Sequence, residues 1–284
     1  MSNQPTTQAP PARFRLRVRY AKRGRLSYLG HLEVIHTVER IIRRAALPYA
    51  VSQGFSPHMR VGYTSALPVG TSSSCEWYDV FLTDLVPLDE AMERLRAASP
   101  DDLAPAQAAY IDLRTPALTA QITRVGYRLL LYAPDGSPLT GDRVHDALEA
   151  VRALGTIEYR RGKKLKKLDL DRSLVSYQVS ACGDMAETAG ALPPDGAVCV
   201  DLDTRCDNEG SLRPEILLAA VDQALCGIEP GSREIVSSGI QDLSAIGRYE
   251  VERSWQAIED EDGTLRDPLG ARVDVSRDAP LGNL

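Results

Sequence analysis

The sequence predicts an α/β (α+β) protein built from two ferredoxin-like α/β sandwich units with mainly antiparallel sheets. Three observations support this prediction. The chain has 284 residues, of which 43% are apolar, and at roughly 150 residues per domain this is enough for about two packed cores. Segments with the two-residue period of strands alternate with segments that have the period of helices. An order of strand, helix, strand, strand and helix occurs twice.

We expect four segments along the chain. Residues 1–12 are rich in Pro, Gln and Thr and predict a disordered leader. Residues 13–112 form the first ferredoxin-like unit, and residues 113–240 form the second, which carries a basic hairpin. Residues 241–284 are acidic and polar, and we expect a largely disordered tail.

In the first unit, the segment from Arg13 to Tyr20 alternates basic and apolar residues. This pattern predicts a strand with one face toward the core and a row of arginines on the other face. From Gly30 to Ala46, apolar residues recur every three or four positions, which predicts an amphipathic helix that ends before Pro48. A loop containing Gly and Pro then lies between two short strands. A further strand and helix are expected at Glu76–Thr83 and Leu88–Ala98.

The second unit has the same kinds of segment in a similar order. Strand-like patterns occur at Gln121–Tyr132, Gly155–Arg160, Leu174–Val179 and Ala197–Leu202, and helical patterns at Arg143–Leu154 and Arg213–Leu225.

Composition excludes several classes of protein. No apolar run approaches the ~18 residues that a membrane helix needs, and the first residues lack the apolar stretch of a signal peptide. The five cysteines form no CxxC pair and no CxxxCxxC triplet of the kind that holds an iron–sulfur cluster. We therefore expect a cytoplasmic protein without a membrane segment, a disulfide framework or a cluster of its own.

Positive charge is concentrated in two places although the formal net charge is −6. Residues 11–60 hold eleven Lys and Arg and two acids, and residues 159–167 hold six cations and no acid, whereas residues 181–284 are strongly acidic. Such clusters favour contacts with the phosphates of a nucleic acid. The candidate phosphate-binding residues are Arg15, Arg17, Arg19, Arg40, Arg43, Arg44, Arg160, Arg161, Lys163, Lys164, Lys166 and Lys167.

A short loop carries the most distinctive chemistry. Ser52–His58 reads SQGFSPH, in which Gly and Pro constrain an aromatic ring, hydroxyls and an imidazole. We expect Gln53, Phe55, Ser56 and His58 to hold a flexible nucleotide, with Phe55 stacking on a base. A packed structural loop is the alternative. His58 and His31 are candidates for acid–base catalysis. No metal site is expected, because the histidines lack further ligands at suitable spacing.

The longest motifs resemble those of a known family. They are FRLRVRYAKRGRLSYLGHLEVIHTVERIIRRAALP from residue 14, YAVSQGFSPHMRVGYTSALPVGTSS with the following Glu76, and the later RRGKKLKKLDL and SLRPEILLAAV. On these motifs the chain is similar to the radical SAM-associated (radical SAM-linked) proteins, a bacterial domain of unknown function. The resemblance implies a partner, because such proteins are encoded beside, or fused to, a B12-binding radical SAM protein.

Three functions agree with these features. The preferred hypothesis is an RNA-binding accessory protein that presents tRNA or rRNA to a separate B12-binding radical SAM enzyme in RNA modification or processing. S-adenosylmethionine, the iron–sulfur cluster and cobalamin are then expected only in the partner, and this chain binds no cofactor. The second hypothesis is a stand-alone RNA-processing or RNA-modifying enzyme that uses His58. The third is a protein-interaction module for the radical SAM partner.

Overall fold

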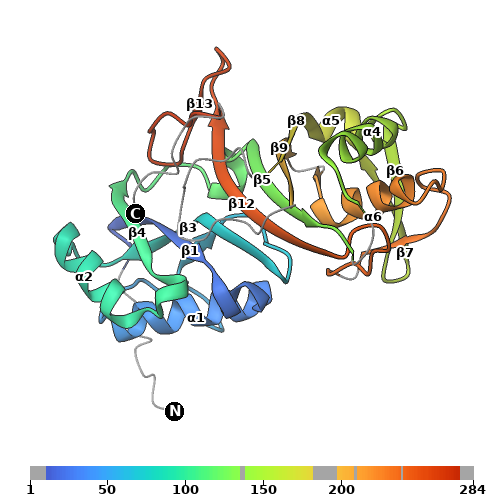
Figure 1. Cartoon of the computed structure of the whole chain (residues 1–284). Helices are drawn as coiled ribbons and strands as arrows, with labels where there is room; N and C mark the ends of the chain where they lie inside the picture. Colours follow the sequence, from blue (N-terminus) through green and yellow to red (C-terminus); the bar gives the residue numbers. More distant parts are fainter. Residues whose placement is uncertain (1–10, 135–137, 182–196, 208–209, 238, 276–284) are drawn as a thin grey trace. The chain divides into compact units, whose positions relative to one another are not determined.

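The structure is a computed structural model that describes residues 11–134, 138–181, 197–207, 210–237 and 239–275. The chain divides into two compact units, shown with the chain coloured by sequence in Figure 1. Unit 1 comprises Met1–Leu67 and Cys75–Gln121, and unit 2 comprises Pro68–Ser74 and Ile122–Leu284. The boundary therefore lies between residues 121 and 122 instead of 112 and 113, and seven residues from the first part of the chain belong to unit 2. Most of the predicted leader lies outside the described residues.

Unit 1 consists of a sheet and two main helices. Figure 1 shows α1 and α2 on the same face of this sheet, whose strands lie in the order β4-β1-β3-β2. The elements are β1 (Phe14–Lys22), α1 (His31–Arg44), β2 (Val61–Tyr63), β3 (Thr71–Leu82, with residues 75–82 in this unit), α2 (Leu88–Ala98), β4 (Pro105–Ile111), the four-residue α3 (Leu118–Gln121) and two short 3-10 helices at Gly24–Tyr28 and Asp101–Leu103.

The core of unit 1 follows from the apolar periodicity of its elements. Alternate residues of β1, including Leu16 and Val18, pack against the apolar stripe of α1, of which Val38 and Ile42 are almost fully buried. Tyr78 and the apolar residues that follow it in β3 complete this cluster. Burying each large apolar side chain contributes about 1.5–3 kcal/mol, so these facing stripes hold α1 on the sheet.

Unit 2 contains a larger sheet and a separate three-stranded sheet. In the larger sheet, β9 pairs with β8, β10 and β5, β5 pairs with β12, and β12 pairs with residues 71–73 of β3; the second sheet has the order β11-β6-β7. The elements are β5 (Arg124–Tyr132), α4 (Gly141–Arg152), β6 (Thr156–Arg161), β7 (Lys164–Asp169), α5 (Leu170–Ser173), β8 (Leu174–Ala181), β9 (Val198–Asp207), β10 (Gly210–Ser211), α6 (Pro214–Leu225), β11 (Ile235–Val236), β12 (Arg248–Glu259) and β13 (Leu265–Arg266).

The predicted fold class is confirmed. The protein mixes helices with sheets whose strand pairs are mostly antiparallel, as in the β1–β4, β5–β9 and β5–β12 ladders. The finer assignment of both units to the ferredoxin-like type stays a prediction. Among the described residues, no helix is both long and apolar enough to span a membrane.

The expectation of a largely disordered tail from residue 241 is wrong for β12. This twelve-residue strand spans Arg248–Glu259 and pairs with β5 over nearly its whole length. Its buried positions include Arg253 and Gln256, each 2% exposed, and a bulge between Arg253 and Trp255 shifts the register. Because polar side chains occupy buried positions and the bulge changes the alternation, the apolar pattern of a strand is missing from the sequence.

Candidate functional site

The arginines of β1 do not form the exposed row that the alternation predicts. Arg15 and Arg17 are 4% and 1% exposed, and Asp79 of β3 lies between them. The Nε atoms of Arg15 and Arg17 donate to the Asp79 carboxylate at 3.1 and 2.8 Å. The placement of these two arginines in solvent is therefore a wrong prediction, because both faces of β1 are covered within unit 1.

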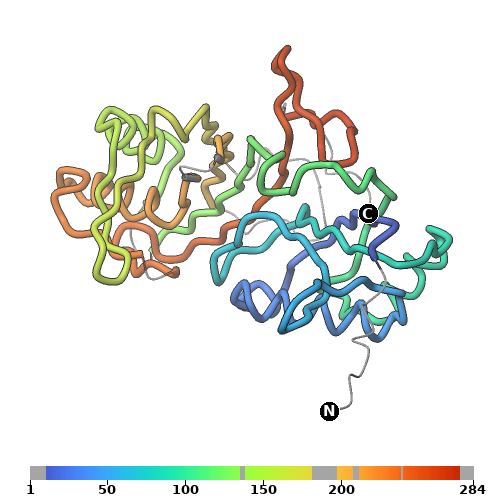
Figure 2. Tube along the Cα trace, turned by 180° about the vertical axis from the view of Figure 1, so that it is seen from behind, coloured from blue at the N-terminus to red at the C-terminus, as the bar shows by residue number. Residues whose placement is uncertain are grey.

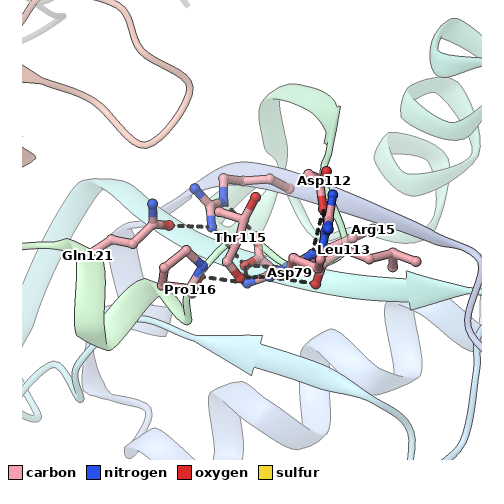
Figure 3. Close-up of polar contacts among 9 residues, drawn as sticks. Arg15, Asp79, Asp112, Leu113, Thr115, Pro116 and Gln121 are labelled. Carbon is pink, nitrogen blue, oxygen red and sulfur yellow. Dashed lines mark hydrogen bonds and ion pairs between the residues drawn. The ribbon is translucent and has the colours of Figure 1, made fainter.

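Arg15 also organises the loop that follows β4. Figure 3 shows its guanidinium between Asp79 and this loop. It donates to the carbonyl oxygens of Leu113 (3.5 Å) and Pro116 (3.0 Å) and, over a short distance, to that of Thr115. These bonds satisfy a buried guanidinium, so Arg15 has a structural role. Arg19 is less buried than Arg15 and Arg17, and its guanidinium lies 6.0 Å from the centre of the Trp77 ring.

The cations of α1 lie on the exposed face of the helix. Arg40, Arg43 and Arg44 are all exposed. Arg43 pairs with Glu39 one turn earlier at 3.2 Å, and Arg40 donates to the hydroxyl of Thr37 at 3.0 Å. Pairs of this exposed kind are worth only a few tenths of a kcal/mol, so these side chains can reorient toward a polyanion.

The SQGFSPH loop is exposed from Gln53 to His58 and is closed at its base by hydrogen bonds. The backbone N–H of Ser52 donates to the carbonyl of His58 at 2.8 Å, and the N–H of His58 donates to Oγ of Ser52 at 3.0 Å. Gly54 has a φ of +138°, which favours glycine. The side chains of the predicted residues Gln53, Ser56 and His58 are exposed, and Phe55 is fully exposed.

Unit 1 also contains a small polar pocket. Nothing in the sequence indicates that its lining residues come together. Three of its polar side chains are buried: Lys22 is 1% exposed, and Glu76 and Thr64 are each 4% exposed. Oγ1 of Thr64 donates to Oε2 of Glu76 at 3.0 Å. The pocket has a volume of about 10 Å³, and the residues that line it are Tyr20, Lys22, His31, Val34, Tyr63, Thr64, Ser65, Leu67 and Glu76.

His31 lies at the edge of this pocket, as the first residue of α1. Its ring makes an edge-to-face contact with Tyr63, with 6.3 Å between the ring centres. The Tyr63 hydroxyl donates to the carbonyl of Ile35 at 3.4 Å. Burial, followed by the negative charge of Glu39, raises the pKa of Tyr63. The Tyr63 hydroxyl therefore stays protonated at neutral pH.

The two histidines that the sequence offered as a catalytic pair belong to different elements, His31 to the start of α1 and His58 to the SQGFSPH loop. His58 is not among the residues that line the pocket of His31. It precedes Tyr63, the ring partner of His31, by five residues of largely extended chain. The pairing of His31 with His58 in acid–base catalysis therefore stays a prediction.

The basic hairpin of unit 2 is formed by β6 and β7, shown in yellow-green in Figure 2. The two-residue turn consists of Gly162, with a φ of +58°, and Lys163. At the base, Ile157 and Leu168 face each other and are 1% and 5% exposed. All six predicted cations are exposed: Arg160, Arg161, Lys163, Lys164, Lys166 and Lys167.

Acids neutralise part of this hairpin. Nε of Arg160 donates to Glu234 at 2.6 Å, and Nζ of Lys167 lies 3.0 Å from Glu158. Burial raises the pKa of Glu215 in α6, against the opposing effects of nearby positive charges that include Arg161. In the described part of the chain, Lys163, Lys164 and Lys166 have no ion pair.

Two sequence predictions concerned metals and thiols. Within the described ranges, no three His, Cys, Asp or Glu side chains converge in an arrangement that could hold a metal ion. Four cysteines are described, and none of these four forms a disulfide bond: Cys75, Cys199 and Cys206 are buried and Cys226 is exposed. Cys182 lies outside the described residues.

Comparison with known proteins identifies the family. Residues 15–214 match the model of a family described as an uncharacterized protein conserved in bacteria, DUF2344. The match covers most of the chain, which therefore belongs to this family. None of the curated proteins matches it.

Among solved structures, one that matches is titled "Crystal Structure of a Cbf5-Nop10-Gar1 Complex". The alignment has 12% sequence identity and a TM-score of 0.41, and it covers 87% of this chain and 50% of that chain. This chain thus spans about half of the length of the protein it matches.

Proposed function

We propose that this protein binds RNA and acts as an accessory subunit of a separate B12-binding radical SAM enzyme in RNA modification or processing. The observation that carries the proposal is the β6–β7 hairpin, whose exposed cations outnumber the acids that pair with them. A polyanion gains affinity there by releasing counterions from its phosphates.

The hairpin holds its cations in a defined arrangement. Directly opposite residues of an antiparallel pair share one face, so Arg161 and Lys164 lie side by side next to the turn, and Lys166 lies opposite Tyr159 on the same face. The apolar base anchors the strands, since Tyr159 is also buried, at 8% exposure. The positive charge is therefore presented at the end of a packed element instead of on a flexible segment.

Unit 1 supplies further RNA contacts in this proposal. Phe55 is fully exposed at the tip of its loop, where a ring can stack on an unpaired base. Gln53, Ser56 and His58 offer polar groups beside it. The exposed arginines of α1, together with Arg19, contact phosphate. Arg15 and Arg17 are left out of this set, because Asp79 and the loop after β4 already bind their guanidinium groups.

Charge removal at the hairpin turn tests the proposal. We expect Lys163→Gln with Lys164→Gln to weaken binding of bulk tRNA. The slope of log K against log[salt] should fall by about 1.4–1.8, since each lost phosphate contact changes it by about 0.7 for single strands and about 0.9 for a duplex. Fluorescence anisotropy over a salt series measures both quantities.

The matched control is Arg114→Gln with Arg152→Gln, which removes the same charge from two other exposed positions. We expect its salt slope to equal that of the wild type. Equal losses in both double variants would contradict a specific role of the hairpin, and wild-type protein that binds no tRNA at low salt would overturn the proposal.

The partner is tested separately. Tagged protein should retain the radical SAM protein encoded nearby, and nuclease treatment before capture separates direct contact from association through RNA. Persistence of the complex after nuclease supports an accessory subunit. If the complex persists and the protein binds no RNA, it is a protein-interaction module.

A further inference from the structure

We infer that the pocket formed by Lys22, Glu76, Thr64 and His31 binds a ribose 2′-hydroxyl group, and that it gives the protein a preference for RNA over DNA. This inference rests on the proposed RNA binding and adds a function to a pocket that the hairpin does not involve.

Both charged side chains of the pocket are buried. Lys22 and Glu76 are among the residue types least often buried, yet they are 1% and 4% exposed and line the same pocket. Removing charged groups from water costs several kcal/mol per ion unless other groups compensate. Convergence of such side chains in a concave site is typical of functional sites.

The pocket has room for one small group. A volume of about 10 Å³ corresponds to a single water-sized group. A phosphate or a nucleobase does not fit into this space, whereas a hydroxyl group does. The pocket is reached past side chains that are not fully buried, because Ser65 is exposed and His31 and Tyr63 are partly exposed.

The lining of the pocket offers both donors and acceptors of hydrogen bonds. The lining includes an ammonium group, which only donates hydrogen bonds, a carboxylate, which only accepts them, and hydroxyls and an imidazole, which do both. The 2′-hydroxyl both donates and accepts, and it is the group by which proteins distinguish RNA from DNA. A lining that contains both donors and acceptors suits such a group better than it suits an anion, because Glu76 repels negative charge.

The position of the pocket agrees with this ligand. Within unit 1, Tyr63 and Thr64 stand at the end of β2, while Phe55 stands in the loop that precedes this strand. The largely extended residues 59–63 separate the two, so the pocket and the exposed ring are contacted by different nucleotides of one strand. Phe55 then supplies sequence-tolerant stacking, and the pocket reads the sugar.

The test compares two oligonucleotides that differ only in the 2′-hydroxyl. Fluorescein-labelled oligouridylate of about twelve nucleotides and its all-2′-deoxy counterpart are titrated with the full chain by fluorescence anisotropy. We expect the wild type to bind the ribose form about tenfold more tightly, as one hydrogen bond involving charged groups allows. Glu76→Gln and Lys22→Met should reduce this ratio to near one.

One control variant and one replacement variant accompany this test. Glu93→Gln, on the exposed face of α2, should keep the wild-type ratio. If Glu76→Gln and Lys22→Met fail to fold, His31→Gln at the partly exposed edge of the pocket replaces them, with folding checked by circular dichroism.

The outcomes separate the two proposals. Equal affinity of the wild type for both oligonucleotides would overturn the inference and leave RNA binding intact. A ratio that survives Glu76→Gln or His31→Gln would also overturn it, because the hydroxyl would be read elsewhere and the pocket would hold only water. Absence of binding to either oligonucleotide would overturn the proposed function, and the inference would fall with it.

Discussion

Cations that look alike in the sequence have two different environments in the structure. Arg15 and Arg17 are buried around Asp79, whereas Lys163 and Lys164 of the hairpin are exposed. A buried arginine paired with a carboxylate contributes to the fold and not to the surface potential. The count of eleven cations in residues 11–60 therefore overstates the charge that a polyanion meets on unit 1.

Asp79 is the residue whose loss should cost most stability. Asp79→Asn keeps the shape of the side chain but leaves two buried guanidinium groups without their carboxylate. Breaking a buried pair in this way costs about 3–5 kcal/mol. We expect a lower urea midpoint in equilibrium unfolding followed by circular dichroism.

Asp112→Asn is the control, because Asp112 is exposed and pairs with Arg114 at 3.5 Å. We expect its midpoint to stay at the wild-type value, since exposed pairs of this kind contribute little. An Asp79→Asn protein as stable as the Asp112→Asn protein would show that the arginines do not depend on Asp79.

Of the candidate site, the SQGFSPH loop could be predicted from the sequence and the pocket could not. The SQGFSPH loop was recognised because its Gly and Pro mark a loop, and its side chains are exposed as such loops require. The pocket was not predicted, because Lys22, Thr64 and Glu76 come from three separated elements. The sequence did hold one signal of a special role for Lys22. It is the only lysine before residue 163, and the cations around it are all arginines.

At the scale of elements, regular apolar patterns predicted structure well. The α1 and α2 helices were expected from their apolar stripes, and the structure contains both. The solvent face of β1 was predicted wrongly, because periodicity within a strand does not show that a distant acid and loop will cover its polar side. β12 was missed because Arg253, Ser254 and Gln256 are buried in it.

The packing of β5 against β12 depends on a glycine. Gly126 stands opposite Trp255 at the bulge, and a Cβ atom at Gly126 would lie 2.1 Å from Nε1 of Trp255. We expect Gly126→Ala to destabilise the protein by about 1–3 kcal/mol through overpacking, seen as a lower midpoint in thermal unfolding.

Gly62→Ala in β2 is the matched control, because a Cβ atom there meets nothing within 4 Å. Its thermal midpoint should stay close to that of the wild type. If Gly126→Ala is equally harmless, Trp255 moves freely and does not fix the register of the bulge.

At the scale of the whole molecule, the units are not consecutive pieces of chain. Residues 68–74 belong to unit 2 although unit 1 surrounds them in sequence. Within unit 2, Val251, Glu252 and Arg253 of β12 pair in parallel with Thr71, Ser72 and Ser73. A cut between residues 121 and 122 therefore does not release a complete unit 2.

We expect a fragment of residues 122–284 to lose hydrogen-exchange protection at the β12 amides that face residues 71–73. The pairing partner is missing from this fragment, and exposed strand edges exchange readily. Mass spectrometry of the fragment and the full chain measures the difference. The β5–β9 ladder is the internal control and should stay protected; unchanged protection at β12 would contradict this account.

The pairing of Ser73 with Arg253 joins residues that are 180 positions apart. At about 5–20 residues per second of synthesis, the ribosome needs roughly 10–40 seconds to deliver the second residue after the first. During this time the emerging residues 71–73 lack the β12 residues with which they pair in the folded protein. This parallel pairing therefore cannot form until synthesis has passed residue 253, long after the first residues of unit 1 have emerged.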